Sequence, residues 1–259
     1  MNRITEAFGK GKAFIPFLTA GDPDLETTGE FLKTLATSGA DLIEIGIPFS
    51  DPIAEGSVIE AADVRALDGG FTVDELFELV ARVRPELEVP LLFMTYYNPI
   101  FVTGAEKFCV RCEEAGIEGL IIPDLPFEER DELLGIARSK GVTLISMIAP
   151  TSSDERIRTI ARASEGFLYC VSSLGVTGER RVLGDAARDM IEAVRRESEI
   201  PCAVGFGVST PEQARDLADF ADGVIVGSAI VRIVADQGRD ATDSIARFTR
   251  EMKQAVSGR

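Results

Sequence analysis

A single glutamate, Glu44, stands inside the apolar run "LIEIGI" at residues 42–47. A carboxylate in apolar surroundings is costly, so its neighbours normally neutralise it, pair it or use it. On a strand, Leu42, Glu44 and Gly46 share one face and the three isoleucines share the other. Burial would raise the pKa of Glu44 and make it a proton donor near neutral pH. The alternative is a structural glutamate held by neighbouring N–H and O–H groups.

The sequence contains no histidine. This excludes Ser-His-Asp and Cys-His catalysis and nearly all catalytic zinc sites, so acid–base chemistry falls to carboxylates, tyrosines or lysines. Cys109 and Cys112 form a Cys-x-x-Cys pair, but no second pair or histidine is available to complete a zinc site. We therefore expect no metal site, with these two cysteines as ordinary helix residues and Cys170 and Cys202 in the core.

Two glycine-containing turns indicate phosphate binding. Gly205 and Gly207 end the apolar run in "VGFGVSTPEQ", and Gly227 and Ser228 end the next one in "VIVGSAI". Each turn precedes a helix start, where backbone N–H groups can hold an anion without any lysine. Either turn alone is typical of an ordinary loop; the two together predict a phosphate site.

The segment "SSLGVTGERRVLGD", residues 172–185, is long for a connection between a strand and a helix and carries three glycines. Such a loop is typical of a lid that closes over a site. A surface loop without function is the alternative.

Eight apolar runs that could position these groups recur about every 30 residues, each followed by a helical pattern. Alternation of strand and helix predicts parallel strands, and runs that are apolar on both faces suit a covered sheet. No linker divides the chain. We therefore predict one α/β domain over residues 1–259, a (β/α)8 TIM barrel, with a doubly wound open sheet as the alternative. The runs are residues 13–19, 41–47, 90–96, 119–124, 142–149, 166–172, 201–207 and 222–228.

Helix starts are marked by threonines followed three residues later by Glu or Gln, the capping-box spacing. Thr72, Thr103 and Thr210 fit this pattern. In a barrel, chemistry sits at the carboxyl ends of the strands. The residues found there are Asp22, Glu44, Asp51, Glu55, Tyr96, Asp124, Tyr169, Gly207 and Gly227.

The formal charge of -16 argues against a nucleic-acid partner, because such binding depends on basic surface. No apolar run approaches the roughly 20 residues of a membrane span. The first residues, "MNRITEAFGKGKAF", lack the apolar region of a signal peptide, so we expect a cytoplasmic protein.

Aldol-type cleavage of a sugar phosphate would suit these groups. The few lysines lie near the N-terminus or in helix and loop patterns, which disfavours a Schiff-base route. Metal-dependent aldolases normally hold zinc with histidines. Acid–base cleavage by carboxylates remains.

Seven motifs together resemble one family along essentially the whole chain, and in that family's order. They are "PFLTAGDPD", "IEIGIPFSDPIAEG", "YYNPI", "IIPDLP", "GVTG", "GFGVSTPEQ" and "VIVGSAIV". The chain resembles the tryptophan synthase α subunit family. This resemblance implies a (β/α)8 barrel that splits indole-3-glycerol phosphate into indole and glyceraldehyde 3-phosphate without a cofactor.

The resemblance also assigns roles. Glu44 matches the acid–base glutamate that protonates indole C3, and Tyr169 matches the tyrosine beside it. Phe17 and Tyr96 match residues that line the indole pocket. The second catalytic acid of the family is normally an aspartate in "ADG", whereas this chain has "AEG" with Glu55. A glutamate can still accept a hydrogen bond from the indole N–H, but its carboxylate reaches about one methylene further.

The remaining correspondences concern the phosphate and the lid. Thr177 matches the lid threonine that closes on the second acid. The residues that match the phosphate-binding positions are Gly178, Gly207, Gly227 and Ser228.

The resemblance implies a partner as well, a pyridoxal-phosphate β subunit in an α2β2 assembly. The expected contacts are Asp51, Asn98 and Phe101, in the loops after the second and third strands. Three other functions remain open: a degenerate binding subunit that activates the partner, a stand-alone lyase, and a sugar-phosphate isomerase, whose usual histidine is missing.

Overall fold

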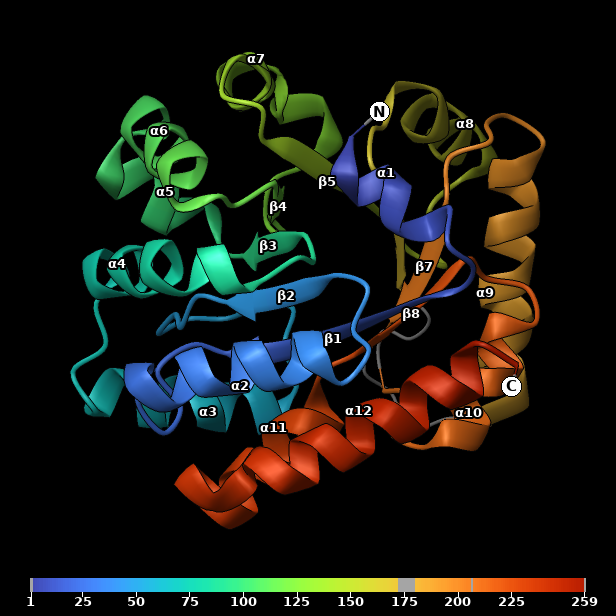
Figure 1. Cartoon of the computed structure of the whole chain (residues 1–259). Coiled ribbons are helices and arrows are strands. Elements are labelled where there is room, and N and C mark those ends of the chain that lie inside the picture. The colour runs from blue at the N-terminus through green and yellow to red at the C-terminus, as the bar shows by residue number, and fades with distance from the viewer. Residues whose placement is uncertain (1, 172–179, 206, 259) are drawn as a thin grey trace.

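The fold was analysed in a computed structural model, which describes residues 2–171, 180–205 and 207–258. Eight parallel strands close into a barrel, because β1 pairs with both β2 and β8, and helices surround them (Figure 1). The predicted (β/α)8 barrel is confirmed and the open sheet is wrong. The strands are β1 (Ala13–Thr19), β2 (Ile43–Gly46), β3 (Leu91–Met94), β4 (Gly119–Ile121), β5 (Thr143–Ile148), β6 (Leu168–Val171), β7 (Cys202–Gly205) and β8 (Gly223–Val226).

Each of these strands lies within one of the eight apolar runs, and most are a few residues shorter than the run. The surrounding helices are α1 (Arg3–Phe8), α2 (Leu25–Thr37), α3 (Ser57–Asp68), α4 (Val73–Val83), α5 (Tyr97–Thr103), α6 (Ala105–Ala115), α7 (Asp131–Ser139), α8 (Asp154–Ala163), α9 (Arg180–Arg195), α10 (Pro211–Ala218), α11 (Ser228–Gln237) and α12 (Thr242–Val256). Three short 3-10 helices are η1 (Arg84–Glu86), η2 (Phe127–Glu129) and η3 (Gly238–Ala241).

Two of the three expected helix caps are present. The Thr72 side chain accepts the backbone N–H of Glu75 at the start of α4. Thr210 and Gln213 form a full capping box at the start of α10. These contacts satisfy backbone donors that have no partner within the helix.

The prediction that Thr103 caps the start of a helix is wrong. Thr103 is the last residue of α5, and its hydroxyl donates to the carbonyl of Pro99 at 2.9 Å. Gly104, at φ +87°, separates α5 from α6. A glycine adopts this backbone angle without steric cost, so the chain turns here and begins a new helix.

The side chains of the barrel divide into an inner and an outer layer. Ile43, Ile45 and Ile47 pack outward in the cluster that joins the strands to the helices. Phe17 and Leu42 lie in the inner cluster. The face assignment made from alternation along the second strand is therefore confirmed.

Helix α1 closes the amino-terminal end of the barrel. Ile4 is fully buried in the inner cluster, and the hydroxyl of Thr5 donates to the carbonyl of Gly166, just before β6. The open end of the barrel is thus the opposite one, at the carboxyl ends of the strands.

Cys109 and Cys112 are buried on α6 and form no disulfide. Burial raises the pKa of the Cys109 thiol to about 11, which disfavours the reactive thiolate. The described residues contain no cluster of side chains suited to hold a metal ion. None of the described helices is long and apolar enough to cross a membrane.

We predict that Gly46→Ala destabilises the protein by about 1–3 kcal/mol, the usual cost of overpacking. A Cβ atom on Gly46 would lie 2.4 Å from Cζ of Phe17, and the ring has little room to withdraw because it packs against Gly227, the residue after β8. Urea unfolding measures the effect. The matched control is Gly135→Ala on α7, where a Cβ meets no atom within 4 Å and should not destabilise. Equal unfolding midpoints for Gly46→Ala and the parent would contradict the packing argument.

Candidate active site

Glu44 lies on β2 inside the barrel, between Phe17 of β1 and Leu92 of β3 in the strand register. Its side chain is 0% exposed, and neither carboxyl oxygen has a hydrogen-bond partner among the described residues. Burial raises the pKa of Glu44 to about 8. The group is therefore protonated at neutral pH, because the apolar surroundings disfavour its charged form.

A second buried polar group, missed by sequence reasoning, is Thr19. Alternation along β1 places it on the same inner face as Phe17, and it pairs in register with Gly46 of β2. Its hydroxyl oxygen is buried and has no partner among the residues the structure describes. The position of Thr19 at the carboxyl end of its strand was the available signal.

Tyr169 on β6 reaches the same region. It is buried, and its hydroxyl lies so close to Gly205 that a Cβ atom there would be 2.6 Å away. Burial raises the pKa of Tyr169, and the charges of Glu44 and Glu55 raise it further. Both carboxyl groups therefore lie close enough to the Tyr169 phenol to affect its pKa.

Glu55, in the loop between β2 and α3, is held by Tyr96. The Tyr96 hydroxyl donates to the Glu55 carboxylate and accepts the backbone N–H groups of Ile53 and Ala54, each at 2.9 Å. The Tyr96 ring stacks on Phe49 with centroids 5.0 Å apart. Burial raises the pKa of Glu55, while the Tyr96 hydrogen bond acts in the opposite direction. Tyr96 therefore fixes the loop that carries Glu55, the predicted second acid.

Asp63 on α3 is a further buried carboxyl that the sequence did not reveal. Burial and the nearby charge of Glu55 raise the pKa of Asp63 to about 7, against a hydrogen bond from the backbone N–H of Phe49. It thus anchors the start of the loop that holds Glu55. In the sequence, Asp63 is one of several acidic residues in a predicted helix, so nothing marks it as a candidate.

Two predicted candidates have structural roles instead. Asp22 is buried and forms a two-pronged ion pair with Arg65, with bonds of 2.9 and 2.7 Å. Asp124 accepts the backbone N–H of Tyr97 at the start of α5, at 2.9 and 3.1 Å. Both carboxylates are occupied by the protein itself.

The two glycine turns differ. Gly227 precedes α11, whose first residue is Ser228, and no side chain caps this N-terminus. A Cβ atom on Gly227 would lie 3.1 Å from the ring of Phe17, which accounts for the glycine. Gly207 has φ +83° and open space around it, so its glycine is required by the backbone. Thr177 and Gly178 lie outside the described residues.

The predicted partner contacts are exposed at the same end of the barrel. Asp51 and Asn98 are exposed, and Phe101 is 71% exposed on α5. Ile53 and Val102, both 76% exposed and not identified from the sequence, add to this apolar surface. Large apolar side chains exposed together are typical of an interaction surface.

Comparison with known proteins places this barrel in a family. The family model described as "Tryptophan synthase alpha chain" matches residues 5–257. The tryptophan synthase alpha chain of Lacticaseibacillus casei is 44% identical over 259 residues, covering 100% of this chain and 97% of that protein. The chain belongs to the tryptophan synthase alpha chain family. The resemblance found in the motifs is confirmed.

Solved structures of tryptophan synthase have the same fold as this chain. One from Mycobacterium tuberculosis superposes with a TM-score of 0.91 at 34% identity, covering 99% of this chain and 98% of that one. A chain of the tryptophan synthase α2β2 complex of Pyrococcus furiosus superposes with a TM-score of 0.86 at 40% identity, covering 93% and 98%. Tryptophan synthase alpha chains cleave indole-3-glycerol phosphate to indole and glyceraldehyde 3-phosphate, so the predicted lyase class is confirmed and an isomerase is excluded.

We predict that the free energy of unfolding responds to the titration of Glu44. The unfolded chain releases this proton near pH 4.5 and the folded protein near pH 8. Between these values the folded state binds more protons, so stability falls as pH rises. Glu44→Gln lacks this titration, and its stability relative to the parent should increase from pH 5 to pH 8, by at most about 1.4 kcal/mol per pH unit. Urea unfolding at several pH values measures it; a constant difference would refute the assignment.

Proposed function

We propose that Glu44 is the general acid of the lyase reaction and protonates C3 of the indole ring. The observation that carries this role is its complete burial with a pKa of about 8, which keeps a transferable proton on the carboxyl group at neutral pH. Once C3 is protonated, the bond between C3 and the glycerol chain breaks and its electrons return to the ring. The glycerol hydroxyl loses its proton to a base, for which the Glu44 carboxylate is then available. The products are indole and glyceraldehyde 3-phosphate.

Glu55 accepts the indole N–H and stabilises the positive charge that develops on the ring. Its contact with the Tyr96 hydroxyl supports this role, because that bond limits the positions a longer side chain can take. Tyr169 lies beside Glu44 and packs at the reacting ring. Phe17, whose ring packs against both Gly46 and Gly227, lines the indole pocket together with Tyr96.

The phosphate of the substrate binds at the start of α11. Gly227 and Ser228 stand at a helix N-terminus that no side chain caps, where free N–H groups and the helix dipole favour an anion. Gly207 in the preceding turn, Gly178 and the lid residue Thr177 complete the set in this proposal.

The partner is a tryptophan synthase β subunit in an α2β2 assembly, as in the Pyrococcus furiosus complex. Asp51, Asn98 and Phe101 contact it, and the exposed side chains of Ile53 and Val102 support a partner at this surface. Pyridoxal phosphate belongs to the β subunit, and this chain acts without a cofactor. Residues 1–259 act as one barrel domain in the cytoplasm, the location that fits a biosynthetic enzyme of small metabolites.

The function is tested by incubating the purified chain with indole-3-glycerol phosphate and following the release of indole. Glu44→Gln keeps the shape of the side chain but removes the proton, so turnover should fall about 10²–10⁴-fold while KM changes little. Near-normal turnover in Glu44→Gln would rule out the proton-donor role.

The departure from the family aspartate gives a second prediction. Glu55→Ala should remove most of the lyase activity, about 10²-fold or more, because no carboxylate then supports the indole nitrogen. Glu55→Asp restores the family residue and should retain or improve kcat. An active Glu55→Ala variant in the same indole assay would show that another group carries this role.

Docking of the β subunit should raise the lyase rate at least tenfold, equivalent to about 1.4 kcal/mol of barrier. The physical route is the loop after β2, since Ile53 is exposed at the partner surface while its backbone N–H binds Tyr96, which holds Glu55. Steady-state indole production with and without the cognate β subunit measures the effect. An unchanged rate, with no complex in sedimentation, would indicate a stand-alone lyase.

A further inference from the structure

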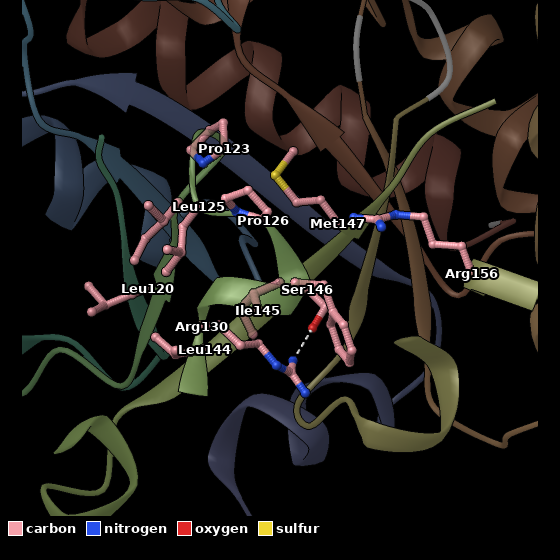
Figure 2. A pocket seen from close by; sticks show the side chains of 12 residues that line it. Leu120, Pro123, Leu125, Pro126, Arg130, Leu144, Ile145, Ser146, Met147 and Arg156 are labelled. Carbon is pink, nitrogen blue, oxygen red and sulfur yellow. Dashed lines mark hydrogen bonds between the residues drawn. The ribbon is translucent and has the colours of Figure 1, made fainter. Parts of the chain in front are cut away.

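A cavity of about 150 Å³ lies beside β4 and β5, and Figure 2 shows the side chains that line it. It is enclosed by β4, β5, the loop after β4 and the start of α7. Leu120 and Leu144 on its lining belong to the outer cluster that joins strands to helices, whereas Ile145 and Met147 on β5 belong to the inner cluster, so the cavity lies at the barrel wall. The apolar wall is formed by Leu120, Ile122, Leu125, Pro126 and Leu144.

Two arginines line this cavity, and one of them, Arg130, is only 7% exposed. Its Nη1 donates to the hydroxyl of Ser146 at 2.8 Å, as the dashed line in Figure 2 marks, and its Nη2 donates to the carbonyl of Ala163 at 3.1 Å. The guanidinium carbon lies 3.8 Å from the centre of the Phe127 ring. The group is therefore fixed in place by neutral partners.

The charge of Arg130 lacks a counter-ion in the part of the chain that the structure describes. The ion pair of the partly buried Arg84 with Glu118, at 3.2 Å, shows the contrast, as does that of the more exposed Arg65 with the buried Asp22, at 2.7 Å. Burial lowers the pKa of Arg130, as does the charge of Arg138, while the charges of Asp131 and Glu165, neither of which forms an ion pair with it, act in the opposite direction. A guanidinium stays protonated in proteins. A buried charge without a partner costs several kcal/mol, which a bound anion would offset.

We propose that this cavity binds a small organic carboxylate. The planar guanidinium of Arg130 presents N–H donors in the geometry that a carboxylate accepts. The apolar wall takes the hydrocarbon part, and an apolar cavity of about 150 Å³ holds a benzene ring. An inorganic or sugar phosphate fits poorly, because it has no apolar part to cover Leu120 and Leu144.

The rim of the cavity supports the choice of Arg130 as the anion contact. Arg156 also lines the cavity, but its guanidinium is already paired with Glu128, with one bond at 3.0 Å. The loop at the rim includes Asp124, which holds the start of α5. A bound carboxylate would therefore contact the segment that positions α5.

The probe is benzoate, titrated into the full chain and followed by calorimetry and by saturation-transfer NMR. Saturable binding is expected below about 10 mM, at least tenfold tighter than binding of benzyl alcohol, its neutral analogue. Arg130→Gln should weaken benzoate binding at least tenfold. The matched control Arg162→Gln removes an arginine on α8 that lies outside the cavity and should leave the affinity unchanged.

Leu125→Trp provides a second variant, which fills the cavity but keeps Arg130, and it should also abolish binding. If thermal unfolding shows that Arg130→Gln does not fold, benzoate binding by Leu125→Trp tests the proposal instead. Glycerol 3-phosphate, which targets the barrel mouth, should not displace benzoate. The proposal is overturned if benzoate binding does not saturate up to about 10 mM, or if benzyl alcohol binds equally well. It is also overturned if Arg130→Gln or Leu125→Trp binds benzoate normally, or if glycerol 3-phosphate displaces benzoate.

Discussion

The enclosure of the Glu44 carboxyl group inside the barrel is the constraint on which the site depends. No described residue offers its oxygens a hydrogen bond, so the group avoids the cost of a buried charge by keeping its proton. The same apolar packing that forms the inner layer therefore sets the acid strength of Glu44, the proposed general acid. Stability and reactivity are linked at this residue, because any change that admits water or a donor to Glu44 lowers its pKa.

The protein treats its buried charged groups in three ways. Glu44 is neutralised by protonation, Asp22 is paired with Arg65, and Arg130 is held only by neutral acceptors and an aromatic ring. The first lies inside the barrel at the proposed reaction centre, the second fixes a loop to α3, and the third lines a cavity beside β4 and β5. A difference in partners thus separates structural charges from those left available for a ligand.

Tyr96 connects the interior with the partner surface. Its hydroxyl bonds the Glu55 carboxylate and two backbone N–H groups of the loop, while its own position is the residue before α5. The exposed Phe101 lies on that helix. A partner that orders either the loop or α5 would act on the second acid through one side chain. This compact connection suits an alpha chain that works within a complex.

The sequence by itself determined the barrel, the inward face of Glu44 and the family. These follow from local order: eight apolar runs, alternation along a strand, and motifs in a fixed sequence. Helix ends were determined only where the cap and its partner lie three residues apart, as at Thr210; the expected cap at Thr103 failed because Gly104 turns the chain.

Only the tertiary structure decided which polar side chains remain free. Asp22 and Asp124 looked equivalent to Glu44 as acids at strand ends, but each found a partner distant in sequence, Arg65 or the backbone of Tyr97. Nothing in the sequence distinguishes Arg130 from other arginines, yet folding buries it without an ion pair to any residue that the structure describes. Burial and pairing depend on segments brought together by barrel closure, and no local pattern encodes which of them meet.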